Sequence, residues 1–143
     1  ARCQPLLHSW LLDSPSGEAV ALVGIGNLGR AILSYLPARH TGLAIVAAFD
    51  SDPSKVDRII HGCRCFSMDK MDSKIKELKI DIGIIAVPAP AAQDVANRLV
   101  RSGVRGILNF APTPLRLPPS VYQEEVDMTV SLEKTAYFSR KSL

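Results

Sequence analysis

The strongest chemical signal in the sequence is a glycine-rich segment with the spacing G-x-G-x-x-G, made of Gly24, Ile25, Gly26, Asn27, Leu28 and Gly29. In such a segment the first glycine permits a tight turn, the second lets a pyrophosphate approach the backbone, and the third lets a helix pack closely on its strand. The N–H groups and the dipole of that helix favour a phosphate. Glycines are common in turns, so the surrounding elements decide whether this segment binds a dinucleotide.

An acidic residue about 20 positions further on completes the dinucleotide-binding pattern. Asp50 lies at this distance and closes the apolar run 45–49. Its carboxylate can accept hydrogen bonds from both ribose hydroxyls and would repel a 2′-phosphate, which favours NAD over NADP. Asp52 strengthens that repulsion, whereas Lys55 and Arg58 leave NADP open. The alternative is a solvated acid that follows an ordinary glycine turn.

Two further loops follow predicted strands and could line the same cleft. The candidate residues in the first loop are Val87, Pro88 and Ala89, and those in the second are Asn109 and Phe110. Small side chains in the first loop would let a ligand lie close, and the second loop could border a nicotinamide. The alternative for both loops is ordinary stiffening by proline. Tyr35 has the helical spacing of a core residue, with a hydroxyl near the ligand cleft as the other interpretation.

The sequence contains no clear acid or base for catalysis. None of His8, His40 and His61 lies where an orienting acid is expected, and no lysine or serine with an activating neighbour follows the later strands. We therefore predict a domain that binds a dinucleotide without catalysing a reaction on it.

The cysteines predict neither a disulfide framework nor a metal site. Cys3, Cys63 and Cys65 are odd in number and do not have the spacing of a four-ligand zinc site. Free thiols in a reducing cytosol are expected, with a redox-active pair at 63 and 65 as the alternative.

The elements that would position these residues alternate between strands and helices. Strands are predicted at 19–23, 43–49, 63–66, 80–87 and 104–109, and helices at 28–36, from Ser67 to 78, and between Pro90 and Gly103. Four prolines make 111–120 a loop, 126–133 alternates like a half-buried strand, and a final helix passes through 136–138. This order predicts an α/β fold, a doubly wound parallel sheet of the Rossmann-like dinucleotide-binding type.

Length and composition limit the alternatives. The 143 residues suit one domain, 47% are hydrophobic, 22% are charged, and the net charge is +3. No apolar run is long enough for a membrane span, and the charge is too small for a surface that coats nucleic acid. We expect an arm or linker at 1–17 and the dinucleotide-binding domain at 18–143. Because the chain begins with Ala1, we expect a processed or truncated product from which a partner domain is absent.

Four segments together resemble the Rex family of redox-sensing transcriptional repressors. They are VGIGNLGRAI (23–32), AAFDSDPSKV (47–56), DIGIIAVPAPAAQDVANRLVRSGVRGILNFAP (81–112) and VDMTVSLEKTAYF (126–138). The resemblance covers roughly residues 18–138 and is far more specific than the glycine spacing alone.

The resemblance implies a cytoplasmic bacterial regulator that senses the NADH/NAD ratio. It implies a homodimer in which NADH binding releases operator DNA from a winged-helix domain, and that domain is absent from this chain. The helix at about 132–143 resembles the segment exchanged between subunits. Tyr35 and Asp127 match positions that read the nicotinamide redox state and relay it. By the same resemblance the glycine segment holds the pyrophosphate, Asp50 the ribose, and Pro88, Ala89, Asn109 and Phe110 line the cleft.

Two alternatives remain open at this point. One is a small NAD-dependent oxidoreductase, or the nucleotide-binding half of one. The other is a CoA-binding domain of the succinyl-CoA synthetase type, which also uses a glycine-rich first turn. Asp50 argues against CoA, because a carboxylate suits a free ribose diol and not a 3′-phosphate.

Overall fold

The computed structural model describes residues 17–35 and 42–141. The predicted arm, apart from Gly17, lies outside these ranges, and so do Cys3, His8 and His40. The elements follow in the order β1 (Glu18–Val23), α1 (Asn27–Tyr35), β2 (Leu43–Asp50), β3 (Ile59–Ile60), β4 (Cys63–Ser67), the 3₁₀ turn η3 (Met68–Lys70), α2 (Met71–Glu77), β5 (Ile82–Ile85), α3 (Ala89–Arg101), β6 (Gly106–Asn109), β7 (Tyr122–Glu125) and α4 (Met128–Lys141).

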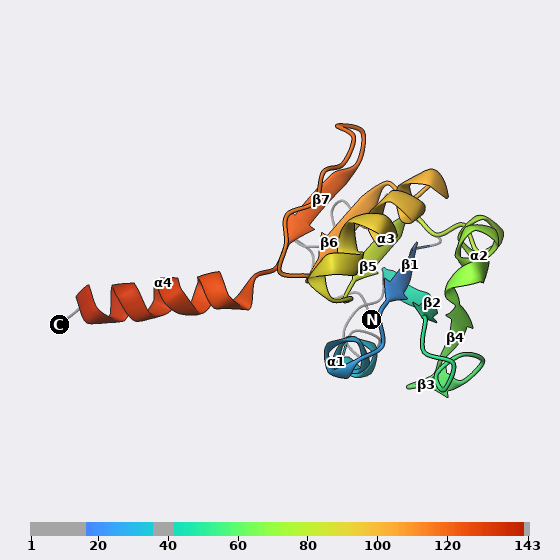
Figure 1. Ribbon diagram of the computed structural model, residues 1–143, viewed down its shortest axis with the longest axis horizontal. Helices are drawn as coiled ribbons and strands as arrows, with labels where there is room; N and C mark the ends of the chain where they lie inside the picture. The colour runs from blue at the N-terminus through green and yellow to red at the C-terminus, as the bar shows by residue number, and fades with distance from the viewer. Residues whose placement is uncertain (1–16, 36–41, 142–143) are drawn as a thin grey trace.

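A single sheet in the order β3-β4-β2-β1-β5-β6-β7 organises the molecule (Figure 1). Its neighbours pair in parallel except β3 and β4, which form an antiparallel hairpin. β1 lies in the middle, and the chain moves outward from it first through β2 and later through β5. The predicted doubly wound α/β fold is therefore confirmed, with the reversal of strand order beside the carboxyl end of β1.

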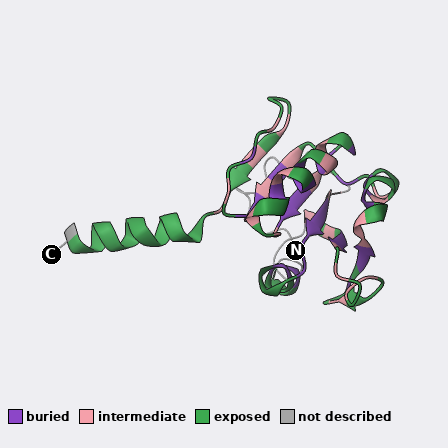
Figure 2. Cartoon of the chain, viewed as in Figure 1, coloured by how far each residue is buried: buried purple, intermediate pink, exposed green. Residues whose placement is uncertain are grey.

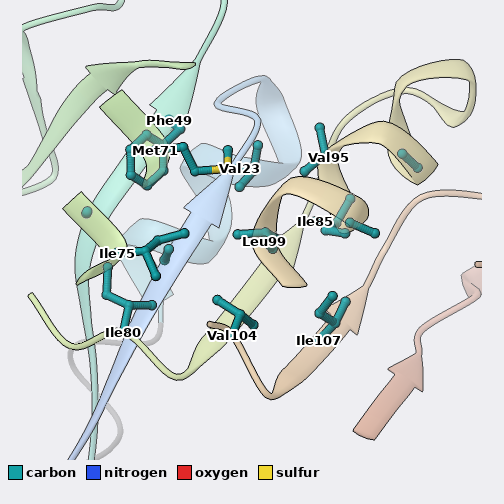
Figure 3. Packing of buried hydrophobic residues seen from close by; sticks show 14 of the residues in the cluster. Val23, Phe49, Met71, Ile75, Ile80, Ile85, Val95, Leu99, Val104 and Ile107 are labelled. Atoms are coloured by element: carbon teal, nitrogen blue, oxygen red, sulfur yellow. The ribbon is translucent and has the colours of Figure 1, made fainter. Parts of the chain in front are cut away.

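Helices cover both faces of the sheet, so its central strand is apolar on both sides. Ala21 and Val23 of β1 pack toward α2 and α3. Figure 3 shows part of this core. Val20 and Leu22 pack toward α1 on the opposite face. An apolar run buried on both faces is what a central parallel strand requires. No helix among the described residues is long and apolar enough to cross a bilayer.

The predicted strand at 126–133 is wrong. The strand there is β7, which ends at Glu125, and α4 begins at Met128 rather than at about 132. The cause is Asp127, whose Oδ1 accepts hydrogen bonds from the N–H groups of Thr129 and Val130, at 3.0 and 3.2 Å. A carboxylate that caps the first turn in this way begins a helix. The apolar alternation does not correspond to a buried face, because residues 128–140 of α4 are all exposed (Figure 2).

The sequence patterns did not predict two short strands, β3 and β7. β7 is an exposed edge strand of sequence YQEE, whose charged residues have low strand propensity and discourage further pairing at an edge. β3 pairs with β4 across a two-residue turn, in which His61 and Gly62 both have positive φ, at 49° and 80°. Positive φ at both central residues is the geometry that hairpin turns of this length favour. His61 is thus an exposed turn residue.

Candidate functional site

The glycine loop connects the carboxyl end of β1 to α1 in the middle of the sheet edge. The Gly24 N–H donates to Phe49 O at 2.9 Å, and the Ala86 N–H donates to Val23 O at 2.8 Å. Gly24 has φ +100°, and a Cβ built on it would lie 2.6 Å from Ala86 O. A side chain there would be strained and would collide with the end of β5, so the tight turn requires glycine.

The other two glycines of the loop have different surroundings. A Cβ on Gly29 would collide with the backbone oxygen of Gly24, which explains the close approach of α1 to the turn. A Cβ on Gly26 would have nothing within 4 Å, so this glycine adjoins open space. The Gly26 carbonyl accepts the Arg30 N–H at 3.0 Å, which leaves the earlier N–H groups of α1 directed out of the helix start. This arrangement suits an anionic group of a ligand.

Asp50 links the end of β2 to the glycine loop. Its Oδ2 accepts the Ile25 N–H at 2.7 Å, and its Oδ1 accepts the Asp52 N–H at 2.8 Å. An ionised carboxylate has about four acceptor sites, so each oxygen can still accept a hydroxyl. The carboxylate is therefore fixed in place and retains capacity for a ribose diol.

A cleft of about 360 Å³ opens at the point where the strand order reverses. Its lining comes from the ends of β1, β2 and β5, from the segment after β2, from η3 and from the first half of α3. The lining residues are Val23, Gly24, Ile25, Gly26, Phe49, Asp50, Ser51, Lys55, Met68, Val87, Pro88, Ala91 and Val95. Ligands of doubly wound folds bind in such a crevice.

The structure brings part of the predicted site to this cleft. Six predicted residues line it: Gly24, Ile25, Gly26, Asp50, Val87 and Pro88. Six others are outside the lining: Asn27, Leu28, Gly29, Ala89, Asn109 and Phe110. Their contact with a bound dinucleotide stays a prediction. Sequence reasoning missed Met68 and Ala91 as lining residues, because their helical spacing marks them only as core or helix-start positions.

Asn109 holds the loop that follows β6. Its side chain is 1% exposed; Oδ1 accepts the Ala111 N–H and Nδ2 donates to Thr113 O, both at 2.9 Å. Buried polar groups of a loop need such partners. The side chain thus satisfies the backbone of this loop, a role that no spacing pattern signalled.

Tyr35 and Phe110 lie together in a second, apolar groove on the α1 face of the sheet. This groove is about 530 Å³ and is lined by Ala31, Ile32, Ser34, Tyr35, Ile84, Leu108 and Phe110. Tyr35 is 54% exposed, so the interpretation of Tyr35 as a core residue is wrong. The apolar helical spacing predicted that the Tyr35 side chain is buried. In the structure an open groove lies between this end of α1 and strands β5 and β6, so the side chain is not covered.

α4 extends away from the sheet (Figure 1). Met128 and Leu132 are 74% and 69% exposed, and Tyr137 packs edge-on against Phe138 with ring centroids 5.1 Å apart. Asp127, which precedes the helix, is exposed and caps it.

The two described cysteines are free, buried thiols. Burial raises the pKa of Cys63 and Cys65 to about 11, and the charge of Asp50 contributes at Cys65. A redox-active cysteine needs an accessible, low-pKa thiolate. The redox-pair alternative therefore lacks the chemistry it requires.

The ionisable side chains in the cleft are both bound to the glycine loop. Asp50 accepts from the Ile25 N–H, and Lys55 Nζ donates to Ile25 O at 2.7 Å. Within 17–35 and 42–141, no three His, Cys, Asp or Glu residues gather in a way that could hold a metal ion.

Comparison with known proteins agrees with this geometry. The family model "CoA binding domain" matches residues 16–113, so the chain carries a domain of that family. The "Redox-sensing transcriptional repressor Rex" of Carboxydothermus hydrogenoformans is 46% identical over 122 residues, which are 85% of this chain and 59% of the relative. The Rex protein of Desulfitobacterium hafniense is 44% identical over 115 residues, 80% of this chain and 55% of the relative. The chain thus spans less than two thirds of these relatives.

Solved structures give the same likeness. RSP, described as a Rex-family repressor, superposes with a TM-score of 0.85 at 31% identity, over 96% of this chain and 66% of RSP. RSP in complex with β-NADH gives 0.84 at 30%, over 97% and 68%. RSP with β-NAD⁺ and operator DNA gives 0.84 at 32%, over 93% and 61%. An aldose-aldose oxidoreductase from Caulobacter crescentus, 18% identical with a TM-score of 0.57, shares the fold alone. By these likenesses the chain belongs to the Rex family.

Proposed function

We propose that this chain is the NADH- and NAD-binding sensor domain of a bacterial transcriptional repressor. The observation that carries the proposal is the 2.7 Å hydrogen bond from the Ile25 N–H to Asp50, which joins the glycine loop to the carboxylate across one cleft. The loop offers N–H groups and a helix start to a pyrophosphate. The carboxylate offers acceptors to a ribose. A dinucleotide with a free ribose diol carries both a pyrophosphate and such a ribose.

The Rex relatives support a sensing role for the bound dinucleotide. RSP crystallised with β-NADH, and also with β-NAD⁺ together with operator DNA. A ligand shifts a conformational equilibrium only if it binds the two states unequally. NADH and NAD differ by one positive charge on the nicotinamide ring, which is the property such a sensor must distinguish. In the proposal NADH binding releases the full-length dimer from its operator.

Charge in the cleft favours NAD(H) over NADP(H) and CoA. Asp50 lines the cleft where the adenosine ribose would bind, and Asp52 follows it just outside the lining. Hydrogen bonds from the backbone and hydroxyl of Ser54 lower the pKa of Asp52, so this carboxylate is ionised at neutral pH. The two carboxylates and the one ammonium of Lys55 leave a net negative charge here, which disfavours a phosphate on the ribose, whether at the 2′ or the 3′ position.

The proposed domain binds the dinucleotide without turnover. An oxidoreductase needs an acid or base beside the reacting group of its substrate. In this cleft Asp50 and Lys55 are instead hydrogen-bonded to the main chain of Ile25.

In the proposed whole protein, residues 1–17 form an arm or linker and 18–143 form the sensor. Operator DNA would be contacted by a winged-helix domain outside this chain, and the regulator would work in the cytoplasm. We further propose that α4 is exchanged between the subunits of a homodimer. Tyr35 and Asp127 would relay the nicotinamide state, because one lies in the apolar groove and the other begins α4.

The direct test of the site is an Asp50→Ala variant titrated with NADH by fluorescence. We expect NADH affinity to fall at least roughly tenfold to a hundredfold, because the loss of even one charge-assisted hydrogen bond costs about 1.5–3 kcal/mol. Tyr35→Phe should weaken NADH less than Asp50→Ala does. The matched control is Asp94→Ala, which removes an exposed carboxylate of α3 that does not line the cleft. NADH affinity retained in Asp50→Ala would refute the assignment of the cleft.

A further inference from the structure

The peptide groups on either side of Ile25 are held by two charged side chains from a different part of the chain. The Ile25 N–H donates to Asp50 Oδ2, and the Ile25 carbonyl accepts from Lys55 Nζ, both at 2.7 Å. Ile25 lies between the first two glycines of the loop, and its own side chain is fully buried. A carboxylate and an ammonium therefore fix the glycine loop at its centre.

The ammonium of Lys55 is itself held in position. Its side chain is 22% exposed, and its Nζ lies 4.0 Å from Asp52 Oδ2. The other oxygen of Asp52 accepts from the backbone N–H and the hydroxyl of Ser54, both at 2.9 Å. The turn after β2 thus orients Asp52, and Asp52 lies beside Lys55. This order of contacts directs the lysine toward Ile25 across the cleft.

We propose that Lys55 is a positioning residue, which keeps the glycine loop in its ligand-binding shape through the Ile25 carbonyl. The proposal rests on the function proposed above, that the loop binds a dinucleotide. A glycine-rich loop has more backbone freedom to lose than other segments, so its ordering on binding costs affinity. A loop that is already ordered in the free protein avoids that cost. The ammonium also offsets the partial negative charge of the Ile25 carbonyl oxygen, which would otherwise repel an incoming pyrophosphate.

The competing role for Lys55 is direct contact with a phosphate, above all a 2′-phosphate. The lysine lines the cleft near Asp50, where that phosphate would bind. Its ammonium has three N–H donors and uses one on the Ile25 carbonyl, so it could also donate to a phosphate. The two roles predict different preferences between NADH and NADPH, so an experiment separates them.

The experiment compares Lys55→Met, which removes the ammonium but keeps an apolar stem, with Lys55→Arg, which can still donate to a carbonyl. Lys76→Met is the matched control, because this lysine is 63% exposed on α2 and does not line the cleft. The first readout is amide hydrogen exchange of residues 24–29 in the ligand-free chain. The second is affinity for NADH and for NADPH.

We expect Lys55→Met to speed exchange in the loop severalfold and to weaken NADH and NADPH by the same factor, about fivefold to twentyfold. Lys55→Arg should restore both readouts to within about twofold of the original chain. Unchanged loop exchange, a loss confined to NADPH, unchanged affinities, or an arginine variant as impaired as the methionine variant would each overturn the proposal. If the original chain bound no dinucleotide, the proposed function would fail, while exchange in the free loop would still report whether Lys55 orders it.

Discussion

The three glycines of the loop do different work, and the structure separates their roles residue by residue. Gly24 is required by its positive φ and by the oxygen of Ala86, and Gly29 by the backbone of the turn itself. Gly26 is required by neither, because a Cβ there would meet open space. The fold does not require glycine here, and under the proposed function the requirement comes from a pyrophosphate that approaches this backbone.

This difference predicts the behaviour of Gly26→Ala. The free energy of unfolding should change by less than about 1 kcal/mol, because the methyl group meets no protein atom and the backbone is not in the left-handed region. NADH affinity should fall by about tenfold or more, because the methyl group occupies the space through which a pyrophosphate approaches.

Urea unfolding and NADH titration measure the two effects separately. Gly106→Ala in β6 is the matched control, since its Cβ would make an ordinary contact of 3.8 Å with Ile82 and lies outside the cleft. A Gly26→Ala chain that bound NADH normally would show that no phosphate passes this glycine.

At this scale the sequence predicted the residues defined by spacing and missed those defined by side-chain direction. Gly24, Gly26 and Asp50 occupy positions that the β–loop–α–β order alone determines, and all three line the cleft. Asn109 ends β6 as Asp50 ends β2, yet its amide turns inward to the backbone of Ala111 and Thr113. Lys55 lies in an irregular turn, so no helical or strand periodicity in the sequence could indicate that its ammonium reaches the Ile25 carbonyl.

Among the helices and strands, apolar patterns correctly predicted the elements that pack into the core. They failed for the segment that packs against no core. β1, β2 and α3 bury the faces that their periods indicate, because each packs against the sheet or a helix. α4 buries no face within the described chain, so its apolar residues carry no interpretable period. Its start was set by a local contact, the Asp127 cap.

The exposure of α4 predicts that this helix forms a subunit interface. Met128, Leu132 and Phe138 are 74%, 69% and 62% exposed, and apolar side chains exposed together on one element mark an interaction surface. Leu132→Glu with Phe138→Glu should shift the chain from dimer to monomer, because two buried charges would be unpaired in the interface.

Analytical ultracentrifugation at several concentrations checks the shift. Ser131→Glu, which adds a charge at a polar position of the same helix, should leave the dimer intact. A chain that is monomeric before any substitution would contradict the exchange of α4 between subunits.

At the scale of the whole molecule, the sheet order places the site. β1 is flanked by β2 and β5, so the glycine loop, Asp50 and the start of α3 meet at one edge of the sheet. The strand–helix alternation predicted that edge without any knowledge of pairing. The apolar groove beside α1, β5 and β6 could not be predicted, because it depends on how far the sheet extends beyond the helix that covers this face.

The proposed sensing role requires that this domain distinguish the two redox states of a nicotinamide dinucleotide. The most direct measurement is a calorimetric titration of the chain with NADH, NAD and CoA under one set of conditions. We expect NADH to bind tightest, with an affinity roughly tenfold or more above that of NAD, since a ligand can shift an equilibrium only by its differential affinity for the two states. CoA should bind weakest, because its ribose phosphate would face Asp50 and Asp52. Comparable affinity for NADH and NAD, or CoA bound tightest, would contradict the account.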